Sequence, residues 1–184
     1  VSAKLREKHP NLSIEIYSES THQIVRKLND FSLDAGILYF NNGDPETTVK
    51  LYEERYVFIA PKSLTVSKEK QITWAEVAQI PLCLLTQNMK NRQLIDRHFL
   101  DLGISPSIVT EASDFTAVLA QVAAGNAATI APVSVAQTFL DLKSTKQLDL
   151  IRPILTHSVG LSIKDQSPVL PMIEALRKAV KCAL

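Results

Sequence analysis

The spacing of hydrophobic and polar residues predicts alternating helices and strands from the start of the chain. Residues 2–9 have helical spacing that ends at Pro10, after which Leu12, Ile14 and Ile16 alternate with polar residues and predict a half-buried strand. The next stretches predict, in order, a helix over 20–31, a buried strand over 33–39, a turn over 41–48 and a strand over 49–61. The first 61 residues therefore indicate helix, strand, helix, strand, strand.

The same alternation continues to the end of the chain. Helices are predicted over 73–78, 88–102, 113–124 and 133–142, and strands over 81–86, 107–111, 127–131, 148–154 and 158–163. The start of a closing helix is marked by Ser167 and Pro168, and its apolar face includes Leu170, Ile173, Leu176 and Val180. This order indicates an α/β protein with mainly parallel sheets. The long connection over 62–71 indicates a break between two lobes.

Particular residues support several of the predicted helix ends. Ser20 with Gln23 has the spacing of a capping box, in which the two side chains satisfy free N–H groups at a helix start, and Thr73 with Glu76 repeats it. Ser113 or Asp114 is expected to cap the helix that follows. Gly103 and Gly125 mark helix ends, because glycine readily adopts the left-handed conformation there.

Composition and charge narrow the class of protein. The chain is 46% hydrophobic and 21% charged, and no apolar run has the roughly 18 residues that span a membrane, which indicates a globular, soluble protein. Twenty basic and 19 acidic residues leave a net charge of +1. The basic clusters lie on three separate predicted helices, so this chain alone is not expected to bind DNA.

Several kinds of chemistry lack the residues they need. The five glycines form no phosphate-binding or dinucleotide-binding loop. No serine lies in a GxSxG motif, and the two cysteines form no CxxC pair. Cys83 lies in an apolar strand, where a thiolate is disfavoured. The four histidines are expected to be surface or capping residues, and the acids Glu53, Glu54, Glu111 and Asp114 to be solvated. We therefore predict no catalysis, no cofactor, no metal and a reducing, cytoplasmic location.

Small hydroxyl and amide residues recur where a predicted strand gives way to a helix. In an α/β sheet such junctions lie at the carboxyl ends of strands, where crevices form and helix N-termini present N–H groups. These residues could line one ligand site, or they could simply cap helices. The candidate site residues are Ser20, Thr21, Gln87, Asn88, Ser113, Phe115 and Thr116, with Ser134 at a further junction.

Several runs of residues, in their order along the chain, resemble the signatures of the effector-binding domain of LysR-type transcriptional regulators. The runs are 6–12, 28–37, 57–61, 72–77, 91–96, 122–125 and 129–132. The resemblance covers nearly the whole chain. It departs from the family at Phe31 and Ala127, where the family usually has glycine, so the turn before Leu33 and the approach after Gly125 are expected to differ locally.

The resemblance implies a two-lobed α/β fold of the periplasmic-binding-protein type (type 2), with two crossover strands. Lobe one is expected at 1–61 and 153–184 and lobe two at 62–152, whereas the first strand of that fold and the winged helix-turn-helix lie outside this sequence. The implied function is to sense a small-molecule effector, an anionic metabolite, in the cleft between the lobes. The alternative is a solute-binding protein of a transport system, and a small-molecule enzyme ranks third.

The resemblance also implies partners. A homodimer or higher homo-oligomer is expected, in which the first helix and the strand over 12–17 pack on the helix over 88–102 of another subunit. DNA is expected to bind only through the absent N-terminal domain, and no membrane contact is expected.

Overall fold

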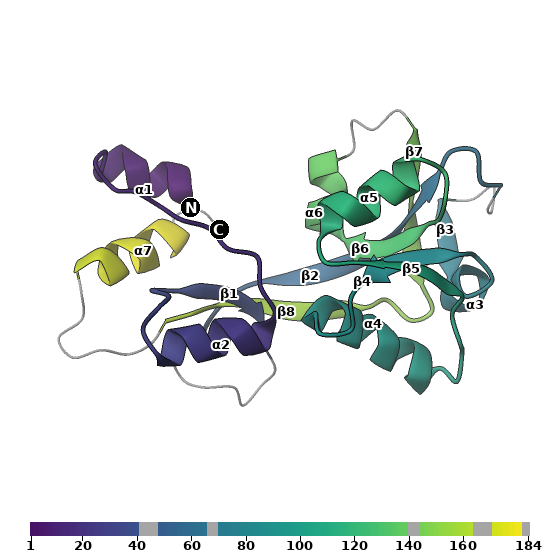
Figure 1. The fold of residues 1–184 in the computed structure, drawn as a ribbon, viewed down its shortest axis with the longest axis horizontal. Helices are drawn as coiled ribbons and strands as arrows, with labels where there is room; N and C mark the ends of the chain where they lie inside the picture. The colour runs from purple at the N-terminus through teal and green to yellow at the C-terminus, as the bar shows by residue number, and fades with distance from the viewer. Residues whose placement is uncertain (41–47, 66–69, 140–143, 164–170, 182–184) are drawn as a thin grey trace. The chain divides into compact units, whose positions relative to one another are not determined.

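The computed structural model describes residues 1–40, 48–65, 70–139, 144–163 and 171–181. Its contacts divide the chain into two compact units, unit 1 (Val1–Glu53 with Ser158–Leu184) and unit 2 (Glu54–His157). The chain passes from one unit to the other within two strands, β2 (Thr48–Pro61) and β8 (Thr156–Ser162) (Figure 1). The lobe boundaries expected from the sequence stay a prediction.

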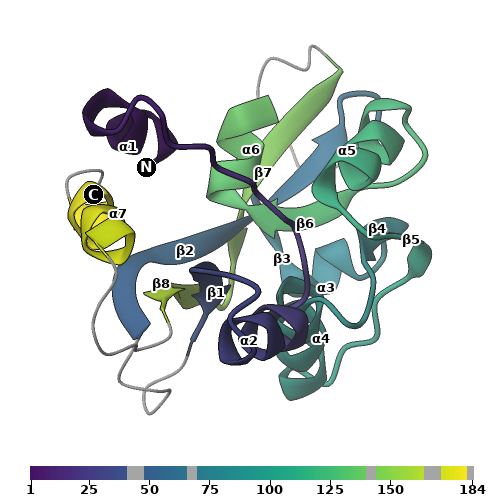
Figure 2. The same ribbon diagram turned by 60° about the vertical axis from the view of Figure 1, so that its left-hand side comes forward.

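The described part of unit 1 combines three helices with the ends of the two passing strands. Its own elements are α1 (Ser2–Lys8), α2 (Thr21–Asn29), β1 (Gly36–Tyr39) and α7 (Pro171–Lys181). Strand β1 pairs antiparallel with β8, and α1 lies beside α7 in both views (Figures 1 and 2). The core of this unit is a cluster from β8, the residue after it and α7: Leu161, Ile163, Ile173 and Val180.

Close packing of α2 on β1 depends on one glycine. A Cβ atom at Gly36 would come within 2.4 Å of Ile24 Cγ2, so a larger residue there would force the Ile24 side chain or the helix to shift. At the start of the connection from α2 to β1, Phe31 has a φ of +60°, in the left-handed region that favours glycine. The turn before Leu33 therefore has a glycine-like backbone although the residue is phenylalanine.

Unit 2 has helices on both faces of its strands, which belong to two sheets joined by a parallel bridge between Leu82 and Ala128. Its strands besides β2 are β3 (Gln71–Thr73), β4 (Leu82–Leu85), β5 (Ile108–Ala112), β6 (Thr129–Pro132) and β7 (Thr145–Ile151). Its helices are α3 (Trp74–Val77), α4 (Lys90–Asp101), α5 (Phe115–Ala123) and α6 (Val133–Phe139). Helices α5 and α6 cover one face and α4 the other (Figures 1 and 2).

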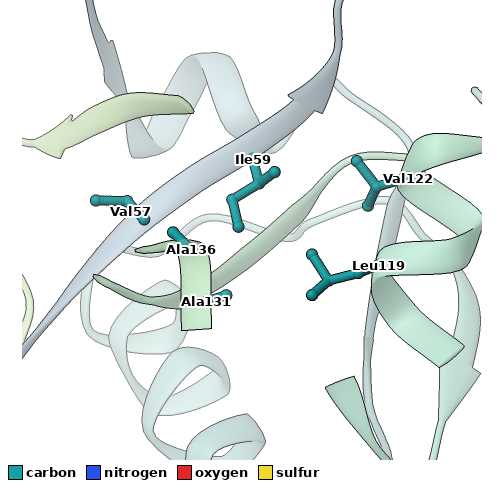
Figure 3. Close-up of a cluster of buried hydrophobic side chains, with 6 residues drawn as sticks. All are labelled: Val57, Ile59, Leu119, Val122, Ala131 and Ala136. Atoms are coloured by element: carbon teal, nitrogen blue, oxygen red, sulfur yellow. The ribbon is translucent and has the colours of Figure 1, made fainter. Parts of the chain in front are cut away.

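The face under α5 and α6 holds a buried apolar cluster. Val57 and Ile59 of β2 form a cluster with Leu119 and Val122 of α5, and Ala131 and Ala136 complete it (Figure 3). Tyr56 and Phe58, which alternate with them along the strand, are fully buried too. This part of β2 is therefore buried on both faces, as its run of large apolar residues indicates.

Most predicted elements are confirmed with small shifts of their ends. Both capping boxes are present, and Asp114 rather than Ser113 caps α5. Gly103 and Gly125 have φ values of +66° and +85°. The predicted turn over 41–48 and the ends of two helices, 140–142 and 167–170, lie wholly or largely outside the described residues.

Two predictions about strands are wrong. Residues 12–17 form no strand, and Ile16 is 82% exposed, because in the part of the chain that is described no strand lies beside this segment to accept its hydrogen bonds. The sheets are not mainly parallel: β2 pairs antiparallel with both β6 and β7, and among the described strands β4 with β5 and β3 with β7 are the parallel pairs. Alternation along the chain does not decide which strands become neighbours. Strand β3 was not predicted.

Candidate functional site

Three strand-to-helix junctions of unit 2 meet at one edge of its sheet. Strands β4 and β5 are parallel, with Leu85 opposite Ala112, and a parallel bridge joins Leu82 to Ala128 just before β6. The carboxyl ends of β4, β5 and β6 therefore point to the same edge. Helices α4, α5 and α6 begin there, which is the arrangement in which α/β sheets bind ligands.

The polar turn after β4 and the junction after β5 lie side by side. The Thr86 N–H donates to the Ala112 carbonyl at 3.0 Å, and the Met89 N–H closes the turn by donating to Thr86 O at 3.0 Å. The side chains of Gln87 and Asn88 are exposed on this turn. In the described residues no side chain caps α4, so its first N–H groups face this turn without a capping acceptor.

The junction after β5 is polar on its surface and apolar beneath. Asp114 accepts the Ala117 N–H at 2.9 Å, and the Ser113 hydroxyl donates to Asp114 at 3.4 Å. Ser113 and Thr116 are exposed. Phe115 packs against two buried clusters, one with β2 and α6 and one with β4, so it joins the site to the core.

The start of β2 within unit 2 lies at the same edge, because Tyr56 is opposite Pro132. The Ser134 hydroxyl, in the first turn of α6, donates to the Glu54 carboxylate at 3.1 Å. The Asn91 amide, in the first turn of α4, donates to the Tyr56 hydroxyl at 3.2 Å. Glu54 and Tyr56, two residues apart on β2, thus contact two of the three helix starts.

The prediction that Glu54 is solvated is wrong. Its side chain is buried, with only 6% of the residue exposed, whereas Glu53 is exposed and accepts a hydrogen bond from Ser158 at 2.7 Å. An acid in a run of alternating charges usually faces water. Successive side chains of a strand point to opposite faces, so one of the two neighbouring acids of β2 points inward; the charge pattern did not show which face is buried.

Arg92 is the other buried charge at this edge, and the sequence reasoning missed it. Its guanidinium donates to Asp96 at 2.7 Å, to the Leu85 carbonyl at 2.8 Å and to Glu111. Burial alone would lower the pKa of Arg92, but the hydrogen bonds to Glu111 and Asp96 outweigh burial and raise that pKa. The i, i+4 spacing of Arg92 and Asp96 was the one signal in the sequence.

The predicted site residues of unit 1 lie at the start of α2. Ser20 is buried, accepts the Gln23 N–H at 3.4 Å and donates to the Gln23 side chain at 2.7 Å. Thr21 is the first residue of the helix and is half-buried. Glu19, which directly precedes Ser20, pairs with Lys27, whose ammonium also lies over the Tyr17 ring. The capping role of Ser20 is thus shown, whereas its role toward a ligand stays a prediction.

The remaining titratable residues offer little chemistry. Cys83 is fully buried, as predicted, and burial raises the pKa of its thiol. The prediction for His98 is wrong, because its ring packs 4.2 Å from Trp74 with Nε2 buried, and burial lowers its pKa. Among the described residues no three His, Cys, Asp or Glu side chains cluster as metal ligands. None of the described helices is long and apolar enough to cross a membrane.

Two surface hollows in unit 1 do not include the predicted residues. One, of about 520 Å³, lies along α2 and is lined by His22, Val25, Arg26, Asn29 and Asp30. The other, of about 410 Å³, lies between α1 and α7 and has Leu5 and Ala179 in its lining. The arrangement that resembles a ligand site is therefore the sheet edge of unit 2, where hydroxyls, amides and helix N-termini gather.

Comparison with known proteins identifies the family. The sequence profile described as the LysR substrate binding domain matches residues 1–184. The chain belongs to this family. This LysR substrate binding domain is 23% identical over 153 residues to a probable RuBisCO transcriptional regulator of Trieres chinensis. The match covers 78% of this chain and 50% of that protein, so the chain spans about half the length of this curated relative.

Solved structures agree with the family on the fold. The regulatory domain of Synechocystis PCC6803 CcmR in complex with 2-PG has a TM-score of 0.86 at 10% identity, covering 99% of this chain and 88% of that one. The effector-binding domain of QuiR in complex with shikimate has a TM-score of 0.80 at 18% identity, covering 97% and 86%. The predicted fold class is confirmed. A solute-binding transport protein is not favoured for this LysR substrate binding domain.

Proposed function

We propose that this domain senses a small-molecule effector for a LysR-type transcriptional regulator, without catalysing a reaction. The observation that carries the proposal is the family match over the whole chain, together with the meeting of three strand-to-helix junctions at one sheet edge of unit 2. Each junction there offers hydroxyl, amide or N–H groups, which are the groups that orient small polar ligands.

The effector is an anionic metabolite that contacts the turn with Gln87 and Asn88 and the junction with Ser113, Phe115 and Thr116. An anionic group fits best beside the first turn of α4, because those N–H groups meet no capping side chain in the described residues and the helix dipole favours negative charge. Asp114 disfavours an anion at the start of α5, so hydroxyl groups of the ligand fit better there. The contribution of Ser20 and Thr21 stays a prediction.

The domain acts within a homo-oligomer in the cytoplasm and reaches DNA through a domain outside this sequence. Exposed apolar side chains on the segments predicted to meet between subunits support self-association: Ile16 and Tyr17 on one segment and Leu100 on α4. Light scattering at micromolar concentration is expected to give at least a dimer. A monomeric mass would contradict this part of the proposal.

The proposal is tested by screening ligands against the purified domain. The panel contains shikimate and 2-PG, the ligands of QuiR and CcmR, together with small monocarboxylates, dicarboxylates and phosphate esters. At least one anion is expected to raise the melting temperature, because a ligand that binds only the folded state stabilises it. Its affinity is then measured by calorimetry.

Two variants show whether the ligand occupies the proposed edge. Asn88→Ala is expected to weaken binding about tenfold, the loss of roughly one hydrogen bond to a charged group. Asn126→Ala is the matched control, since Asn126 is also an exposed turn asparagine but lies beyond the opposite end of α5. Equal affinities of both variants would place the ligand elsewhere, and a panel without any ligand would count against the sensing function.

A further inference from the structure

Arg92 links the junction after β4 to the junction after β5 from the buried side of unit 2. Only 3% of the residue is exposed, and its guanidinium reaches the last residue of β4, Leu85, and the penultimate residue of β5, Glu111. Leu85 directly precedes the turn with Gln87 and Asn88, and Glu111 lies two residues before Ser113. One side chain of α4 therefore holds both chain segments where they leave the sheet.

A second side chain of α4 holds the turn itself. Gln93 Nε2 donates to the Gln87 carbonyl at 3.1 Å, and Gln93 is the neighbour of Arg92. Together the two residues bind the carbonyls on either side of Thr86, whose own N–H bonds to Ala112 of β5. The turn is thus fixed from α4 and from β5, which leaves its exposed side chains in a defined position.

The geometry requires arginine rather than any cation. Nε donates to Asp96 while Nη1 donates to Leu85 O and Glu111, so a single planar group binds partners from α4, β4 and β5. A lysine ammonium is a compact charge without this fixed fork and cannot hold the same directions at once. A buried charge with three partners in place is also costly to disturb.

We infer that Arg92 is the positioning residue of the effector site: by holding Leu85 and Glu111 it keeps the turn after β4 in register with the junction after β5. The inference rests on the proposed function. Groups behind a binding residue commonly control affinity by orienting that residue. In metal sites, their loss lowers metal affinity or activity by about 10–100-fold. Arg92 thus has a role in affinity that its lack of exposure conceals.

The test compares Arg92→Lys with a control on the same helix. Arg97→Lys changes the exposed Arg97–Asp101 pair, which has the same i, i+4 spacing but no contact with a junction. Glu111→Gln is a second variant, milder because Glu111 is 39% exposed and the uncharged amide can still accept a hydrogen bond. For each protein, hydrogen exchange is measured at the amides of Thr86 and Met89, with the Cys83 amide inside β4 as the internal reference.

Arg92→Lys is expected to speed exchange at Thr86 and Met89 at least about tenfold relative to Cys83, and Glu111→Gln to do so less. The affinity for the panel compound that binds the wild type best is expected to fall about tenfold in Arg92→Lys at temperatures where the protein stays folded. Arg97→Lys is expected to match the wild type in both measurements.

Unchanged exchange at Thr86 and Met89 in Arg92→Lys would overturn the inference, as would faster exchange with unchanged affinity. Equal acceleration at Cys83 would show a merely structural role and would overturn it too. If no panel compound binds the wild type, the proposed function fails. The exchange measurement, which needs no ligand, then shows whether Arg92 at least fixes the turn.

Discussion

Phe31 occupies a backbone conformation that favours glycine. Its φ of +60° follows the last turn of α2, where the Ser32 N–H donates to the Lys27 carbonyl at 2.9 Å and closes the helix end. The ring is 56% exposed and therefore gains little from burial. Nothing in the described residues explains why phenylalanine stands at this strained position.

Replacing Phe31 separates this strain from the loss of the ring. Phe31→Gly is expected to be more stable than Phe31→Ala by about 1 kcal/mol, because a residue with a Cβ atom pays for the left-handed conformation. Urea unfolding of both variants measures the difference. Equal free energies of unfolding would mean that the turn relaxes to another conformation when the ring is removed.

His98 gives unit 2 a dependence on pH. Burial beside Trp74 lowers its pKa from the usual 6.5, partly opposed by Asp101. Folding therefore favours the neutral imidazole. The contribution of His98 to stability is complete above pH 6.5, and it is lost as the pH falls from 6.5 through the lower pKa of the folded state. His98→Gln is expected to lack this loss. Unfolding curves between pH 7.5 and pH 5, in steps of about half a unit, compare the two proteins; parallel curves would contradict the shift.

At the scale of the element, a residue at a helix start can cap the helix, contact a ligand, or do both. Measurements of stability and of affinity separate these two roles. Ser20 caps α2 and Thr73 caps α3 by the same reciprocal hydrogen bonds with the residue three positions on. Only Ser20 belongs to the predicted site. The pair is therefore a natural comparison of capping alone with capping plus ligand contact.

Ser20→Ala and Thr73→Ala are each expected to lower the free energy of unfolding by about 1 kcal/mol, the typical value of an N-cap. Ser20→Asp is expected to restore stability, because aspartate caps equally well, and to weaken binding of an anion through charge repulsion. Thermal unfolding and calorimetry give the two quantities. Unaltered affinity in Ser20→Asp would remove Ser20 from the site.

Elements also show where sequence patterns succeed. Helix ends were predicted well because the deciding interactions are local: the side chain of Ser20 bonds three residues away, and Gly125 sets its own backbone angle. The segment over 12–17 failed for the opposite reason, since a strand exists only through a neighbour far along the chain. Capping explains Ser20 and Asp114, so these residue types alone could not distinguish a cap from a binding group.

At the scale of the whole molecule, the distribution of charge argues against DNA binding by this chain alone. Of 20 basic residues, Arg92 is buried, and Lys27, Lys50, Arg55 and Arg97 are paired with carboxylates. Non-specific binding requires several phosphate contacts from one surface. Over the whole chain, 19 acids nearly balance the 20 basic residues.

Titration of this chain into duplex DNA at low salt is therefore expected to show no saturable binding. Fluorescence anisotropy of a labelled duplex measures it, and a longer protein that includes a helix-turn-helix serves as the positive control. Saturable binding that weakens as salt is added would contradict the prediction, since that dependence is the signature of phosphate contacts.

The sequence by itself determined the order and type of nearly all elements, their caps and the family, because these depend on residues close together in the chain. Only the tertiary structure decided that β2 runs antiparallel to β6 and β7, that Glu54 and Arg92 are buried, and that the junctions after β4, β5 and β6 share one edge. These features join residues far apart in the chain: Ser134 and Glu54 are 80 positions apart. Strand neighbours and burial are set by the summed packing of the whole sheet, which no local pattern contains.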